Sequence, residues 1–151
     1  MKIINNMRLI FDSRSANEAF ARTTLAAFVC QLDPTMEEMM DIKTAVSEAV
    51  TNAIVHGYKN KIGKILISSS LYDNNKIVIK IKDYGCGIED IKKAREPLFT
   101  TAPSEERAGL GFALMESLTD KLKVSSKVGK GTTITLERII RSKDSDNEQK
   151  L

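Results

Sequence analysis

The sequence predicts an α+β domain, built as a two-layer α/β sandwich with helices on one face of a mixed, mostly antiparallel sheet. The first observation is the order of the expected elements, which runs strand, helix, helix, hairpin, loop, helix and hairpin. The second is a hairpin signal, because two β-rich runs flank the turn residues Asp-Asn-Asn. The third is the alternation of isoleucines with lysines in the second run, which indicates a sheet with one buried and one solvent-exposed face.

Length and composition exclude several classes of protein. A chain of 151 residues suits one domain, and 42% hydrophobic with 28% charged residues is an ordinary soluble composition. The net charge of +3 is small and the basic residues are scattered, so nothing indicates direct binding of nucleic acid. No apolar run approaches the roughly 20 residues that span a bilayer, and no secretory signal is present. We therefore expect a cytoplasmic protein.

The N-terminal residues predict a short strand over 7–11 and then a helix that runs to about Leu32. Ser15 and Glu18 have the spacing of a capping box, in which each side chain bonds the backbone N–H of the other residue. This spacing places the start of the helix near Ser15. The residues expected along one side of the helix are Phe20, Thr24, Ala27 and Phe28.

A second helix is expected directly after the first. Asp33 suits its N-cap, Pro34 suits its first helical position, and the helix ends near Gly57. Apolar residues recur along it at helical spacing. The ones expected to point inward are Met39, Ile42, Val46, Ala49, Val50 and Ala53.

The rest of the chain predicts two hairpins, separated by a polar segment and a helix. The expected elements are strands over 64–72 and 76–83, a short helix within 88–96, a loop over 97–109, a helix over 110–118, and strands over 121–127 and 132–139. Because no repeat or linker interrupts this order, we expect a single domain over 1–141, followed by a flexible polar tail over 142–151.

Asp83, Gly85 and Gly87 form a glycine motif directly after an expected strand. Two alternate glycines let the backbone turn tightly and let a ligand approach it closely. An aspartate at a strand end can accept a hydrogen bond from an exocyclic amine, such as that of adenine. Taken alone, this motif is more often a plain turn with an acidic N-cap.

A second glycine motif, Gly109–Phe112, lies where a helix begins after the polar loop. Its backbone N–H groups, at the positive end of the helix, suit a phosphate, and Arg107 could add a charge-assisted contact. Many helices begin with glycine, and no Walker A sequence follows. The segment 129–133, which includes Thr132, joins the last two strands and is by itself an ordinary hairpin turn.

Glu48 and Asn52 interrupt the apolar pattern of the second helix. They are one turn apart, so their side chains are neighbours, with about 5–6 Å between Cβ atoms. A carboxylate can accept a proton from a hydroxyl group, and a carboxamide oxygen can bind Mg²⁺. A solvated polar stripe is the ordinary explanation of such a pair when it occurs alone.

Together and in this order, the motifs resemble those of the Bergerat-fold (GHKL) ATPases, which include the ATPase domains of gyrases, heat-shock 90 chaperones, histidine kinases and mismatch-repair proteins. Over residues 7–140 the chain is most similar to the small anti-sigma-factor serine kinases, and in particular to the sporulation anti-sigma-F factors. The segments that carry this resemblance are FARTTLAAFVCQLDPTMEE (20–38), SEAVTNAIVHGY (47–58), DYGCGI (83–88), PLFTT (97–101), ERAGLGFALME (106–116) and GKGTTI (129–134).

The resemblance implies a homodimeric protein with two activities. It would bind and silence a sporulation sigma factor. It would also use ATP and Mg²⁺ to phosphorylate a serine of a small anti-anti-sigma protein, leaving ADP. The alternatives are a stress-response anti-sigma kinase of the same branch, and a nucleotide-gated binding module without kinase activity.

The resemblance also implies a role for each motif residue. Glu48 would be the base that activates the serine hydroxyl, and Asn52 would ligate the Mg²⁺ at the phosphates. Asp83 would bind the adenine amine, beside Gly85 and Gly87. The other expected pocket residues are Thr100 and Arg107 in a lid over 98–108, the backbone of Gly109, Leu110 and Gly111 at the phosphates, and Thr132 near the adenine.

Overall fold

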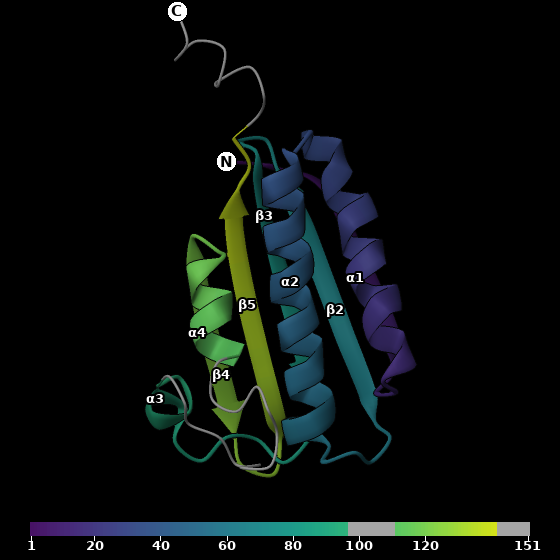
Figure 1. The fold of residues 1–151 in the computed structure, drawn as a ribbon, viewed down its shortest axis with the longest axis vertical. Helices are drawn as coiled ribbons and strands as arrows, with labels where there is room; N and C mark the ends of the chain where they lie inside the picture. The colour runs from purple at the N-terminus through teal and green to yellow at the C-terminus, as the bar shows by residue number, and fades with distance from the viewer. Residues whose placement is uncertain (97–110, 142–151) are drawn as a thin grey trace, which may run out of the picture.

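The structure, a computed structural model, describes residues 1–96 and 111–141. These residues form two layers, in which helices cover one face of a five-stranded sheet (Figure 1). The strand order is β1-β2-β3-β5-β4, and every pairing described is antiparallel. The strands are β1 (Ile3–Asp12), β2 (Lys64–Tyr72), β3 (Lys76–Asp83), β4 (Lys121–Lys127) and β5 (Gly131–Ile139). The predicted α+β sandwich is confirmed.

Both hairpins follow the alternation of the sequence closely. β2, β3 and β4 have the predicted bounds, and β5 begins one residue earlier than predicted. Asn75 closes the β2–β3 turn with a φ of 62°, a left-handed conformation that asparagine tolerates. β1 is longer than predicted, because its pairing with β2 extends back to Ile3, opposite Tyr72.

The helical layer packs on the inner face of the sheet (Figure 1). Its main helices are α1 (Ala16–Val29), α2 (Met36–Asn52) and α4 (Gly111–Ser117). A 3₁₀ turn, η1 (Cys30–Leu32), extends α1, a π-helix, η2 (Ala53–Gly57), extends α2, and the short α3 (Ile91–Ala94) lies beside β4. Within the described ranges, no helix combines the length and apolarity that a membrane span requires.

The predicted capping box at the start of α1 is wrong. Ser15 has helical backbone angles and its side chain makes no capping hydrogen bond. The carboxylate of Glu18 instead accepts a hydrogen bond from the Ser47 hydroxyl group and lies 3.6 Å from the guanidinium of Arg22. A contact between two helices has therefore replaced the local contact that the spacing predicted.

The side of α1 that faces the core differs from the side on which the sequence analysis grouped apolar residues. Ala21, Leu25 and Val29 are fully buried, whereas Phe20 is 54% exposed and Phe28 is only half-buried. The buried residues recur every four positions, so they form a stripe along one face. The two phenylalanines misled the prediction, because their size outweighed this narrower stripe of smaller residues.

The start of α2 differs from the prediction in a similar way. Asp33 has a φ of 51° and ends η1, so it cannot be the N-cap of α2. Thr35 is the N-cap, and it forms a complete capping box with Glu38. The predicted inward face of α2 is otherwise confirmed, with Met39 half-buried at its edge.

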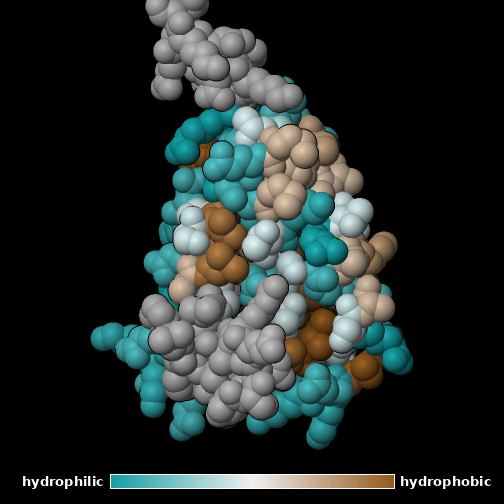
Figure 2. All heavy atoms as spheres, viewed as in Figure 1, coloured by the Kyte–Doolittle hydropathy of each residue, from teal (hydrophilic) through white to brown (hydrophobic). Residues whose placement is uncertain are grey.

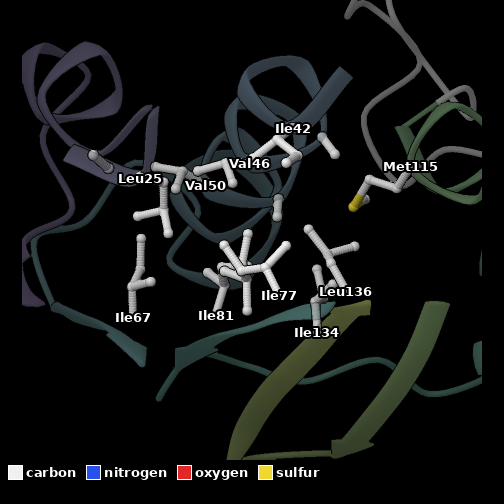
Figure 3. Close-up of a cluster of buried hydrophobic side chains, with 14 of the residues drawn as sticks. Leu25, Ile42, Val46, Val50, Ile67, Ile77, Ile81, Met115, Ile134 and Leu136 are labelled. Atoms are coloured by element: carbon white, nitrogen blue, oxygen red, sulfur yellow. The ribbon is translucent and has the colours of Figure 1, made fainter. Parts of the chain in front are cut away.

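Apolar side chains from both layers meet between the helices and the sheet (Figure 3). The labelled core residues are Leu25, Ile42, Val46, Val50, Ile67, Ile77, Ile81, Met115, Ile134 and Leu136. Each such burial contributes about 1.5–3 kcal/mol to folding. This packing fixes α2 over β3 and β5, so the polar residues near the C-terminal end of α2 are held in a defined place.

The surface of the helical layer is largely hydrophilic in the view of Figure 2, with apolar side chains in separate patches. Several large apolar side chains are exposed, among them Phe20, Met36 and Met40. Exposed apolar side chains are common on the surface of a folded domain.

Candidate functional site

The ends of several elements converge at the end of the molecule where α2 terminates (Figure 1). α2, its extension η2 and β3 all end there, and α4 and β5 begin there. These are the elements on which the sequence places the predicted site residues. The fold therefore gathers segments that lie far apart in the chain.

Glu48 lies near the C-terminal end of α2 and is only 6% exposed. A carboxylate is costly to bury unless its surroundings compensate the charge. The start of α4 lies beside it, because a Cβ atom on Gly111 would lie 3.6 Å from Glu48 Oε2. Asn52, the last residue of α2, is half-buried one turn further along. The structure thus places Gly111 next to Glu48, with Asn52 one turn away.

The π-helix η2 follows Asn52 directly. The Tyr58 N–H donates to the Ala53 carbonyl at 2.9 Å, five residues back, which gives a wider turn than the α-helix has. Short π segments are rare and occur often at functional sites. Here the wider turn carries the chain from Asn52 to Gly57, which lies against β3.

Asp83 is the last residue of β3 and is 3% exposed. Its Oδ1 atom accepts a hydrogen bond from the Gly85 N–H at 2.9 Å. A Cβ atom on Gly57 would lie 2.9 Å from the same Oδ1 atom, so only glycine fits there without moving the carboxylate. Gly57 is a site residue that the sequence analysis missed, because a glycine after a helix indicates only a helix end.

Burial raises the pKa of the Asp83 carboxyl group above its ordinary value, and hydrogen bonds from the backbone N–H groups of Gly85 and Thr132 oppose this shift. Two fixed donors hold the carboxylate in one orientation. When it is ionised, its remaining lone pairs can accept hydrogen bonds from a ligand. This is the property that an adenine amine requires.

The Asp83–Gly87 segment packs closely against the end of η2. The Cys86 N–H donates to the Gly57 carbonyl at 2.9 Å, and a Cβ atom on Gly85 would lie 2.1 Å from that same carbonyl oxygen. Gly87 has a φ of 76°, which glycine adopts without steric cost. Both glycines of the predicted motif are therefore required by the backbone path around the site.

Thr132 is buried near the start of β5 and belongs to a hydroxyl network with β4. Ser126 Oγ lies 2.8 Å from Thr132 Oγ1, donates to the Gly131 carbonyl at 3.0 Å, and accepts from the Ile88 N–H at 2.7 Å. Since Ser126 has one proton to donate, Thr132 is the donor between the two hydroxyl groups. Ser126 is a second residue that the sequence analysis missed.

Part of the predicted site lies outside the described residues. Thr100, Arg107, Gly109 and Leu110 belong to this part, as does the predicted lid over 98–108. In residues 1–96 and 111–141, no three His, Cys, Asp or Glu side chains gather as a metal site.

A hollow of about 360 Å³ opens at the same end of the sheet. Its lining includes Lys82 and Tyr84 together with Asp83, Ser126 and Thr132 of the candidate site, but neither Glu48 nor Asn52. The exposed Lys82 lies on the face of β3 that points away from the helices, since its neighbours on either side in the strand are buried. The hollow therefore borders the candidate site at the end of β3 and the start of β5, without reaching α2.

Comparison with known proteins identifies relatives over nearly the whole chain. Residues 11–138 match the family described as histidine kinase-like ATPase domain. An anti-sigma F factor of Thermoanaerobacter sp. (strain X514) is 57% identical over 142 residues, which are 94% of this chain and 99% of that protein. An anti-sigma F factor of Geobacillus kaustophilus (strain HTA426) is 53% identical over 136 residues, which are 90% and 93% of the two chains.

Among solved structures, the RsbU and RsbW domains of a Mycobacterium tuberculosis protein superpose with a TM-score of 0.64 at 20% identity. The superposition covers 90% of this chain and 32% of that one. At this identity the likeness shows the shared fold alone.

Proposed function

Because the chain belongs to the histidine kinase-like ATPase family, together with the anti-sigma F factors, we propose that it is an anti-sigma factor and an ATP-dependent protein-serine kinase. It binds and inhibits a sporulation sigma factor. It also phosphorylates a serine of the anti-anti-sigma protein that otherwise releases this sigma factor. The observation that carries the proposal is the buried carboxylate of Glu48, one turn from Asn52 and next to the start of α4.

Glu48 is the general base in this proposal. It accepts the proton of the incoming serine hydroxyl as the serine oxygen bonds to the γ-phosphorus of ATP and the bond to the β-phosphate oxygen breaks, releasing ADP. Such phosphoryl transfer needs positioning and charge stabilisation more than covalent help. The start of α4 beside Glu48 supports this role, because the backbone N–H groups of a helix start suit phosphate oxygens.

The residues present fit a Mg²⁺ ion that arrives with the nucleotide. Mg²⁺ in nucleotide sites keeps several waters and takes few ligands from the protein, the rest coming from phosphates. The carboxamide oxygen of Asn52 is such a ligand, in a region where no acidic cluster of described residues competes. When bound, the ion neutralises charge on the phosphates.

Asp83 recognises the adenine base in this proposal. Its carboxylate accepts the hydrogen bond of the exocyclic amine, while Gly57 and Gly85 let the backbone pack closely around it without a side chain that would displace it. Thr132, buried next to Asp83 in the β3–β5 register, completes this wall. In this proposal Thr100 and Arg107, from a lid over residues 98–108, would contact the phosphates. The backbone N–H groups of Gly109, Leu110 and Gly111 would do the same.

We further propose that residues 1–141 form the functional domain and that it works as a homodimer without direct contact to nucleic acid or membrane. The compact two-layer core supports one domain, because both layers share a single cluster of buried side chains. The anti-sigma F factor of Thermoanaerobacter sp. matches 94% of this chain, which also supports a single functional domain.

The proposal is tested by replacing Glu48 with glutamine, which keeps the shape of the side chain and removes the base. We expect Glu48→Gln to bind ATP and sigma factor normally and to phosphorylate the anti-anti-sigma protein about 10²–10⁴-fold more slowly. Radiolabelled phosphoserine on the small partner is the readout. Glu37→Gln, an exposed change on the same helix, is the matched control.

Transfer at the normal rate by Glu48→Gln would reject the assignment of the base. If the wild-type protein sequesters sigma factor in a nucleotide-dependent way but never labels the partner, the chain is instead a nucleotide-gated binding module. If it labels a stress-response partner and ignores the sporulation partner, the sigma-factor assignment is wrong while the chemistry stands.

A further inference from the structure

We propose that Tyr58 is a positioning residue. Its hydroxyl group keeps the end of β3 apart from β2, and in this way it sets the affinity and the base selectivity of the adenine site. This inference rests on the proposed function, because it assigns Asp83 to adenine. Neither the polar pair on α2 nor the glycine motif includes Tyr58, which follows η2 at the start of the loop to β2.

One oxygen atom joins two strand ends. The Tyr84 N–H donates to Tyr58 Oη at 2.8 Å, and the Tyr58 hydroxyl donates to the Lys64 carbonyl. Tyr84 is the residue directly after Asp83, and Lys64 is the first residue of β2. The side chain of Tyr58 therefore reaches across the end of the sheet, immediately beside the residue proposed to bind adenine.

The position of this contact in the β2–β3 register explains its effect. The last pair of the ladder is Ile65 with Asp83, so a regular ladder would next place Lys64 opposite Tyr84. Tyr58 Oη bonds both of these residues instead. This oxygen acts as a spacer that ends the ladder after Asp83, and it still gives the Tyr84 N–H and the Lys64 carbonyl a hydrogen-bond partner. The chain is thereby free to turn away from β2 toward η2.

The tyrosine ring is fixed by close packing on its other side. A Cβ atom on Gly63 would lie 2.3 Å from Tyr58 Cε1, so the ring fills the space that the glycine leaves. Gly63 cannot move away easily, because it exchanges two hydrogen bonds with Ser13, at 2.9 and 2.8 Å. The place of the hydroxyl group is therefore set by packing and not by the hydrogen bonds alone.

Tyr58 also connects the two halves of the proposed site. Its backbone N–H closes the π turn that follows Asn52, and its hydroxyl group ends the ladder after Asp83. Burial raises the pKa of the Tyr58 phenol, so the hydroxyl keeps its proton at neutral pH and can donate and accept at once. One residue thus fixes the distance between the metal-binding and adenine-binding sides.

The test is Tyr58→Phe, which keeps the ring in place and removes only the oxygen. We expect the Kd for ADP to rise about tenfold, the order of magnitude for the loss of one hydrogen-bonding group that positions the site. The preference for ADP over GDP should fall, because guanine carries an oxygen where adenine carries its amine. Kinase kcat at saturating ATP should change far less than the Kd, since Tyr58→Phe keeps the backbone hydrogen bond that closes the π turn after α2.

Two further variants separate positioning from general stability. Tyr72→Phe removes a hydroxyl group at the far end of β2, whose ring lies near Lys76, and should leave the Kd and the ADP preference unchanged. Gly63→Ala displaces the ring and should weaken ADP binding in the same way as Tyr58→Phe. Calorimetric titration of each folded variant with ADP and GDP provides the Kd for ADP and the preference for ADP over GDP.

The outcomes distinguish this inference from the proposed function. A wild-type protein that binds no adenine nucleotide overturns both. A wild-type protein that binds ADP while Tyr58→Phe binds it equally well, or with unchanged preference over GDP, overturns the role of Tyr58 alone. An equal loss in Tyr72→Phe, or a fall in kcat with normal affinity, would also reject it.

Discussion

The carboxyl group of Asp83 is subject to two opposing effects. Burial disfavours its charged form and raises its pKa, while the N–H groups of Gly85 and Thr132 favour the charged form. Burial is the larger effect. Asp83 therefore takes up a proton at a higher pH than an exposed aspartate would, although the proposed contact with adenine requires the ionised acceptor.

This conflict predicts a pH dependence of nucleotide binding. As the pH falls through the raised pKa of Asp83, the carboxyl group becomes protonated, loses acceptor capacity, and binds adenine less well. As the solution is acidified from neutral pH, the affinity for ADP should therefore begin to fall at a higher pH than the ordinary pKa of an aspartate would imply. The Kd measured by calorimetry across this range, for wild type and Asp83→Asn, checks the prediction. Asp83→Asn should bind weakly at neutral pH, and its remaining pH dependence reports titration of the phosphates alone.

The Kd of each protein can be divided by its own Kd at neutral pH. If the resulting pH profiles of wild type and Asp83→Asn were identical, they would contradict the role of Asp83. So would normal ADP affinity of Asp83→Asn at neutral pH. Asparagine has a single acceptor oxygen, and when this oxygen bonds the Gly85 N–H, the amide NH₂ group faces the amine and cannot accept its hydrogen bond.

At this scale, the sequence predicted the residues whose chemistry is unusual for their position. Glu48 and Asn52 interrupt an apolar helix, and Asp83 precedes two alternate glycines, so each is visible as a departure from a local pattern. Gly57 and Ser126 could not be predicted in this way. A glycine after a helix and a serine in a strand are ordinary locally, and their contacts involve residues distant in sequence.

At the scale of elements, η2 sets the approach of α2 to β3. Gly57, its last residue, leaves no room for a side chain, because a Cβ atom would lie 2.9 Å from the Asp83 carboxylate. We expect Gly57→Ala to push this carboxylate aside and to weaken ADP binding about tenfold or more, the order of magnitude for an overpacked contact. Calorimetric titration with ADP is the measurement.

Gly129→Ala is the matched control for this substitution. Gly129 has a φ of 79°, so alanine strains its backbone, but nothing lies within 4 Å of the added Cβ atom. It should lower stability by about 1 kcal/mol without displacing Asp83. An unchanged ADP affinity in Gly57→Ala, or an equal loss in Gly129→Ala, would contradict the proposed contact.

The caps of the two long helices give a second test at this scale. Thr35 accepts a hydrogen bond from the Glu38 N–H at 3.1 Å, whereas Ser15 makes no capping contact. Thr35→Ala should therefore lower the free energy of unfolding by about 1 kcal/mol, and Ser15→Ala should change it by much less. Urea unfolding of both variants measures the difference. The opposite order would support the cap that the sequence alone predicted.

The elements differ in how far the sequence predicted them. The hairpins were predicted well because alternation and turn residues are local signals. Helix starts were predicted poorly, because Ser15, Asp33 and Thr35 all suit an N-cap. The choice among such residues depends on how α1 and α2 pack, as the contact between Glu18 and Ser47 illustrates.

At the scale of the whole molecule, the strand order brings the site together. β5 lies between β3 and β4, so Thr132 is paired directly with Asp83. The sequence predicts the second hairpin but not which of its strands pairs with β3, because either could do so. In physical terms an interior strand needs apolar residues on its inner face, and β5 supplies Ile134 and Leu136. β4 alternates with exposed lysines and forms the edge.

The central claim is that an adenine nucleotide binds between α2 with its extension η2 and the end of β3. A crystal structure of the protein with ADP and Mg²⁺ tests it most directly. The claim predicts the exocyclic amine within hydrogen-bond distance of the Asp83 carboxylate and the ion on the carboxamide oxygen of Asn52. A nucleotide that contacts Lys82 and Tyr84 while its amine and its metal ion reach neither the Asp83 carboxylate nor Asn52 would contradict it.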